Sequence, residues 1–66
     1  MDIVQYNFVG SRLQSRCVVK RKASMQDFID LFGKLRDKAK PGEDVNTYYH
    51  TFSITSDENG VEYSLE

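Results

Sequence analysis

Any chemistry in this chain of 66 residues would rest on one histidine, one cysteine and a few carboxylate pairs. Cys17 and the serines lie in no recognisable nucleophile motif. The pairs Glu43-Asp44 and Asp57-Glu58 stand beside turn residues, where solvated carboxylates are ordinary. His50 is in phase with Phe52, so we expect a partly buried, hydrogen-bonded histidine. The sequence therefore predicts no catalytic residue and a protein that is not an enzyme.

Metal and cofactor sites lack the necessary residues in this sequence. A closed structural zinc site needs four ligands, and one histidine with one cysteine cannot supply them. The four glycines are scattered along the chain and form no loop that would cradle a phosphate. We predict neither a metal nor a small-molecule cofactor.

Basic residues concentrate near the N-terminus and suggest one kind of partner. Residues 1–22 sum to +4 and residues 23–66 to −5, within a net charge of −1. On an extended strand, alternate residues of this basic segment point to one side, where a phosphate backbone could follow them. Single-stranded nucleic acid is therefore the alternative partner, although the acidic balance and the single outward aromatic, Tyr49, disfavour it.

A protein partner is the interpretation we favour. A chain this short buries only about 60% of its unfolded surface, and one cysteine forms no internal disulfide, so a second copy would add core that it lacks. We predict a small binding module for protein–protein interaction or regulation, with a homodimer as one form. The predicted binding residues lie on one open sheet face: Arg16, Val18, Lys20, Lys22, Tyr49 and Thr51.

These residues must be positioned by strands and a helix, which the hydrophobic periodicity locates. Alternation predicts strands at about 2–9, 13–22, 47–55 and 61–65, and Asn59-Gly60 marks a hairpin turn before the last of them. The order β-β-α-β-β predicts one α+β domain over residues 1–66, with two layers. One helix packs on one face of a mainly antiparallel four-stranded sheet. Either strands two and three lie parallel, joined by the helix, or strands one and four pair in the middle.

The helix is expected over about 25–39, with Ser24 as its N-cap and Asp27 in its first turn. Its apolar residues recur at helical spacing and predict one buried stripe. The expected core is Val4, Tyr6, Phe8, Leu13, Cys17, Val19, Phe28, Ile29, Phe32, Leu35, Tyr48, Phe52, Ile54, Val61 and Tyr63.

Two expectations concern the location and the end of the chain. No apolar run approaches the ~20 residues that span a bilayer, and no secretion signal is recognisable, so we expect a cytoplasmic protein without a membrane segment. The final Leu65-Glu66 matches the dipeptide that a cloning site often leaves before a histidine tag. We assign these two residues no functional weight.

Overall fold

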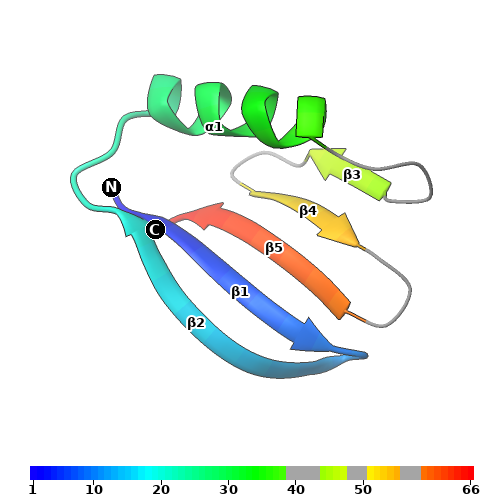
Figure 1. Cartoon of the computed structure of the whole chain (residues 1–66). Coiled ribbons are helices and arrows are strands. Elements are labelled where there is room, and N and C mark those ends of the chain that lie inside the picture. The colour runs from blue at the N-terminus through cyan, green and yellow to red at the C-terminus, as the bar shows by residue number, and fades with distance from the viewer. Residues whose placement is uncertain (39–43, 48–50, 56–58) are drawn as a thin grey trace.

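The computed structural model describes residues 1–38, 44–47, 51–55 and 59–66, and in them one helix covers one face of a five-stranded antiparallel sheet (Figure 1). The elements in chain order are β1 (Ile3–Val9), β2 (Arg12–Lys20), α1 (Met25–Lys38), β3 (Asp44–Thr47), β4 (Thr51–Thr55) and β5 (Asn59–Leu65). The predicted α+β class is confirmed. The sheet contains one short strand, β3, beyond the four that were predicted.

The first and last strands of the chain pair at the centre of the sheet, whose order is β2-β1-β5-β4-β3. This is the second of the two predicted arrangements. Ile3 pairs with Leu65, and backbone hydrogen bonds between Asp2 and Glu66 extend the ladder by one step. Leu65 is only 8% exposed. Leu65 and Glu66, which received no functional weight from the sequence, therefore both belong to the fold.

The single strand predicted over 47–55 is divided in the structure. β3 and β4 pair with each other, Val45 opposite Ile54 and Thr47 opposite Phe52. Tyr48, Tyr49 and His50 lie outside the described residues. Alternation of apolar and polar residues does not show a reversal of chain direction when the residues on both sides are β-branched or aromatic.

The helix begins where the sequence predicts and is capped by a reciprocal pair of hydrogen bonds. The Asp27 N–H donates to Ser24 Oγ at 3.2 Å, and the Ser24 N–H donates to Asp27 Oδ2 at 2.9 Å. This is a capping box in which aspartate replaces the usual glutamate. Two of the N–H groups that the start of a helix leaves without backbone partners are thereby satisfied.

Phe52 on β4 is the centre of the core and is 0% exposed. Phe28 and Phe32 of α1 approach its ring with centroid distances of 5.0 and 4.9 Å, and Tyr63 of β5 stacks on it at 4.9 Å. These tilted and offset arrangements are the ones that aromatic quadrupoles favour. Ile3, Ala23 and Leu65 complete the buried cluster, and Met25, Leu31, Leu35 and Ile54 pack against it.

Ile29, which the sequence placed in the core, is 52% exposed. Leu31 packs against the core in its place. Ile29 and Leu31 flank the line of Phe28 and Phe32 on opposite sides of the helix, at similar angles from it. Helical spacing therefore cannot decide between them, and the rotation of α1 on the sheet does.

Candidate interaction face

The side of the sheet that faces away from α1 has a composition set by the strand register. Residues paired across antiparallel strands point to the same side. Ile3, Phe52 and Tyr63 pack with α1, so their pleat neighbours face the other way. We call this other side the helix-free face, and it consists of Val4, Tyr6, Phe8, Leu13, Arg16, Val18, Thr51, Ser53, Thr55, Gly60, Glu62 and Ser64.

The prediction for β1 was therefore wrong about direction. Val4, Tyr6 and Phe8 were expected to face the helix, and they line the helix-free face instead. On the helix side β1 has apolar residues at its two ends, Ile3 and Val9, and the polar Gln5 and Asn7 between them. The alternation identifies an apolar row but not the layer that this row faces, and the pairing of Ile3 with Leu65 decides that it faces away from the helix.

Two register shifts in the β1–β2 pairing explain further differences from the predicted core. Val4 pairs with Val18 while Ile3 pairs with Lys20, so Val19 is an extra residue; Gln14 is similarly unpaired between Leu13 and Ser15. Such bulges reverse the alternation along one strand. Leu13, Cys17 and Val19 were predicted to share a buried row, and all three are exposed on β2, which is an edge strand.

Apolar side chains form the β1–β2 half of the helix-free face. Val4 is fully buried, Tyr6, Phe8 and Val18 are partly buried, and Leu13 is 50% exposed. α1 contributes nothing to covering them, because the helix packs on the opposite side of the sheet. In the structure this half is therefore an apolar surface in contact with solvent.

Arg16 lies across this surface and is engaged within the chain. Its guanidinium forms an ion pair with Glu66, its Nε donates to the Tyr6 Oη at 3.3 Å, and its Cζ lies 5.7 Å from the centre of the Tyr6 ring. Arg16 on β2 is opposite Tyr6 of β1, and Glu66 is opposite Asp2. The Arg16–Glu66 ion pair therefore crosses β1 above Val4, which lies between Asp2 and Tyr6. This crossing explains why Val4 is buried without the helix.

The basic row predicted along residues 16–22 does not form. The bulge at Val19 turns Lys20 to the helix side, where its Nζ lies 3.0 Å from Asp27 Oδ1. Lys22 follows the end of β2 in a left-handed conformation (φ 52°), and its N–H donates to Asp2 Oδ1 at 3.0 Å. Of the predicted binding residues, Arg16, Val18 and Thr51 share the helix-free face. Lys20 and Lys22 do not, and Tyr49 lies outside the described residues.

Among the residues that the structure describes, two groups have shifted acidities, and both lie on the helix side. The hydrogen bond from the Ser24 N–H, followed by the contact with Lys20, lowers the pKa of Asp27 below its usual value of 3.8. Burial against the core raises the pKa of Tyr63 above its usual value of 10.0, and the nearby Cys17 adds to this rise. Both shifts follow from contacts of the fold and mark no acid–base pair.

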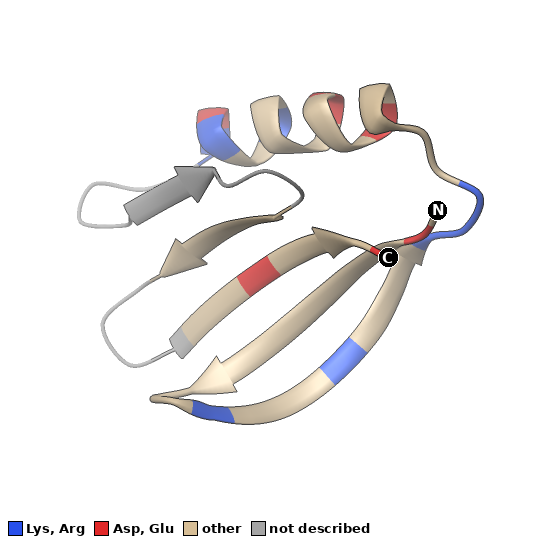
Figure 2. Cartoon of the chain, turned by 180° about the vertical axis from the view of Figure 1, so that it is seen from behind, with Lys and Arg blue, Asp and Glu red and all other residues tan. Residues whose placement is uncertain are grey.

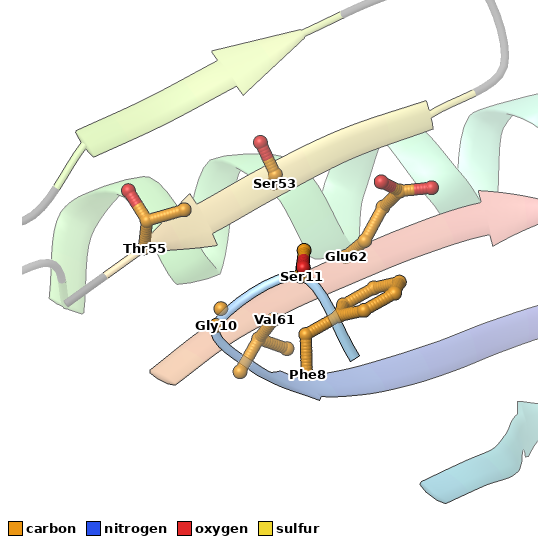
Figure 3. Close-up of a pocket in the computed structure, with 8 residues that line it drawn as sticks. Phe8, Gly10, Ser11, Ser53, Thr55, Val61 and Glu62 are labelled. Carbon is orange, nitrogen blue, oxygen red and sulfur yellow. The ribbon is translucent and has the colours of Figure 1, made fainter. Parts of the chain in front are cut away.

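A hollow of about 290 Å³ opens on the helix-free face over the hairpin end of β5. The turn at Gly10 and Ser11 forms one wall, and Phe8, Ser53, Thr55, Gly60 and Glu62 line the rest (Figure 3). Gly10 has a φ of 62°, as a two-residue hairpin turn with glycine at its first position requires. Gly60 carries no side chain and thereby leaves the floor of the hollow open.

Glu62 is the acidic residue of β5 and lies between Tyr6 and Ser53 in the register. Figure 2 shows acidic positions on α1, on β5 and at the chain ends, with basic positions on β2, in the connection that follows it and on α1. Within the described part of the chain, no basic side chain lies within 4.0 Å of the Glu62 carboxylate. The sequence placed Phe8 and Leu13 in the core and did not single out Glu62, and the available signal was the apolar row of Val4, Tyr6 and Phe8.

The described residues contain no group of three histidine, cysteine or acidic side chains arranged to hold a metal ion. Within the same ranges, α1 is too short and too polar to cross a membrane. Comparison with protein-family models, with curated proteins and with solved structures found no match. Inferences about function therefore rest on the helix-free face and its hollow.

Proposed function

We propose that this chain is a non-enzymatic protein-binding module that engages its partner through the helix-free face, with a second copy of itself as the partner. The observation that carries this proposal is the apolar surface of Tyr6, Phe8, Leu13 and Val18, which no second layer of the described residues covers. Monomeric proteins rarely expose large contiguous apolar patches, and such patches commonly mark interaction sites.

Size and stability favour self-association. The molecule extends 31 × 24 × 17 Å, so one face of the sheet is comparable to the roughly 800 Å² per partner of a stable interface. The described core contains only six buried hydrophobic residues. A second copy packed on the helix-free face would remove Leu13 and Phe8 from water and enlarge this small core.

The charges argue against single-stranded nucleic acid on the same face. A surface that follows phosphates needs cations that are free to replace counterions. On the helix-free face Arg16 is paired with Glu66, and Glu62 adds a negative charge. Two aromatic rings, Tyr6 and Phe8, are present there, so an oligonucleotide titration belongs in the test as a competing outcome.

The test is sedimentation equilibrium of the wild type, Leu13→Asp and the control Ile29→Asp. Both residues are about half exposed, but only Leu13 lies on the helix-free face. We expect wild-type and Ile29→Asp to self-associate alike, and Leu13→Asp to weaken the association by at least about tenfold, because a charge would be buried in the interface.

Three outcomes would overturn the proposal. A wild type that stays monomeric up to about 1 mM would exclude a second copy as the partner. Equal association of Leu13→Asp and wild type would show that another surface is used. Salt-sensitive binding of an oligonucleotide, lost in Leu13→Asp, would assign the face to nucleic acid.

A further inference from the structure

We propose that the hollow beside Glu62 receives an arginine side chain of the bound partner and so fixes the orientation of the complex. This inference rests on the proposed function, because it specifies what the partner presents to the helix-free face. The groups around the hollow are one carboxylate, several hydroxyls and one aromatic ring. That set fits an elongated cation with an apolar stem.

The first argument is charge. Glu62 lies on β5 near the middle of the sheet, flanked by Tyr6 and Ser53, and it is only partly exposed. The other charged residues on the strands whose side chains are described are three cations, all on the edge strand β2. Arg16 and Lys20 already form ion pairs within the chain, and the third is Arg12. A carboxylate covered by an interface needs a cation, because an unpaired charge is costly to bury. The partner is therefore expected to supply one.

The second argument is the shape and polarity of the hollow. Its volume of about 290 Å³ exceeds what a single water molecule fills and accommodates a long side chain. Figure 3 shows Ser53 and Thr55 on β4 and Ser11 on the turn along the hollow, with the Glu62 carboxylate and the Phe8 ring at its right-hand end in this view. A guanidinium carries five donors in a planar fork, so it can bond a carboxylate and nearby hydroxyls together. Its methylenes can pack on Phe8.

The third argument is the missing side chain at Gly60. Its Cα faces the hollow between Phe8 and Thr55, and a Cβ placed there would lie 3.7 Å from Phe8 Cβ and 3.9 Å from Thr55 Cγ2. These are ordinary contacts, and the φ of Gly60 is not positive. Neither the local backbone nor steric crowding therefore requires glycine at this position. What glycine provides is space on the floor of the hollow.

The experiment is an NMR titration of the ¹⁵N-labelled full chain with Nα-acetyl-arginine amide and, separately, with Nα-acetyl-citrulline amide. Citrulline keeps the stem and replaces the guanidinium by a neutral urea. We expect saturable shifts at Phe8, Gly60 and Glu62 with arginine, at a dissociation constant in the millimolar range that ligands of this size reach. Citrulline should bind at least about fivefold more weakly, because it lacks the charge-assisted bond to Glu62.

Two variants and one control make the result specific. Glu62→Gln keeps the size of the side chain and should abolish the preference for arginine over citrulline. Gly60→Ala keeps the carboxylate, narrows the hollow and should weaken both compounds. The control Asp30→Asn removes an exposed carboxylate from α1 and should leave the binding of both compounds unchanged. Unchanged resonances away from the hollow show that each variant is folded.

Failure of this inference can be separated from failure of the proposed function. Equal binding of the two compounds to the wild type, or an arginine preference that survives Glu62→Gln, would overturn the arginine site. The effect of Leu13→Asp on self-association could still stand in that case. Conversely, a monomeric wild type with a Glu62-dependent arginine preference would retain the site and exclude a second copy as its source.

Discussion

At the scale of single residues, burial in this fold depends on the side of the element and less on the type of residue. Phe52 and Phe8 are both aromatic residues within strands. Phe52 has three aromatic neighbours among the described residues and is inaccessible, whereas Phe8 lies partly exposed beside the hollow. The same contrast separates Phe28, which is buried, from its neighbour Ile29, which is not.

This contrast predicts that substitutions at Phe52 and at Ile29 lower the free energy of unfolding by unequal amounts. Phe52→Leu should lower the free energy of unfolding by about 1–2 kcal/mol, because it removes ring contacts with Phe28, Phe32 and Tyr63 and leaves a gap. Ile29→Ala should change it by less than about 0.5 kcal/mol, as exposed positions do. Urea unfolding followed by circular dichroism measures both. Equal costs would contradict the placement of α1.

At the scale of elements, the start of α1 connects the helix to the edge of the sheet. Ser24 and Asp27 cap each other, and Lys20 at the end of β2 adds an ion pair to the same carboxylate. The bulge at Val19 makes this pair possible, since it turns Lys20 toward the helix. A residue that the sequence placed in an outward basic row thus helps to dock the helix.

Lowering the pH should weaken the contacts that Asp27 makes with Ser24 and Lys20. The contacts of Asp27 lower its pKa in the folded chain below the usual 3.8, so their contribution to stability is present above about pH 4 and is lost as the pH falls through the folded value. Asp27→Asn keeps an acceptor oxygen but carries no charge. The thermal midpoint should therefore differ between wild type and variant at about pH 6 and converge at about pH 2. A difference that stays constant over this range would contradict the assignment.

At the scale of the whole molecule, one helix covers one side of the sheet, and the described residues place no second layer on the other side. Pairing of the first and last strands places β2 at one edge and the short β3 at the other. The described core is small for a chain of 66 residues. Association through the helix-free face would couple the stability of the fold to the concentration of the protein.

This coupling predicts that the thermal midpoint of the wild type rises with protein concentration. Mass action favours a dimer over its unfolded chains as the protein concentration rises. A hundredfold increase in concentration stabilises the dimer by roughly 2.7 kcal/mol at most and should raise the midpoint by several degrees. Leu13→Asp should remove the dependence, and Ile29→Asp should keep it. Scanning calorimetry at three concentrations provides the measurement. A midpoint independent of concentration in the wild type would contradict association.

The sequence by itself determined the elements whose signals are local. The helix from Met25 follows from apolar spacing and the Ser24–Asp27 cap, and the class of fold follows from the order of strands around it. Thr51, Val18 and Arg16 were also placed on the correct side of their strands. These features depend on residues a few positions apart, which interact in the same way whatever the rest of the chain does.

Only the tertiary structure decided which faces meet. The apolar row of β1 does not show which layer it faces, Ile29 and Leu31 are equivalent by helical angle, and the bulges at Gln14 and Val19 leave no mark in the alternation. The pairing of β1 with β5, some 60 residues away, turns Ile3 toward α1 and Phe8 away from it. That pairing also brings Phe8 beside Glu62 and Gly60, so the hollow exists only once the two ends of the chain have met. A side chain's direction in a sheet is fixed by long-range register, and register is a property of the folded whole.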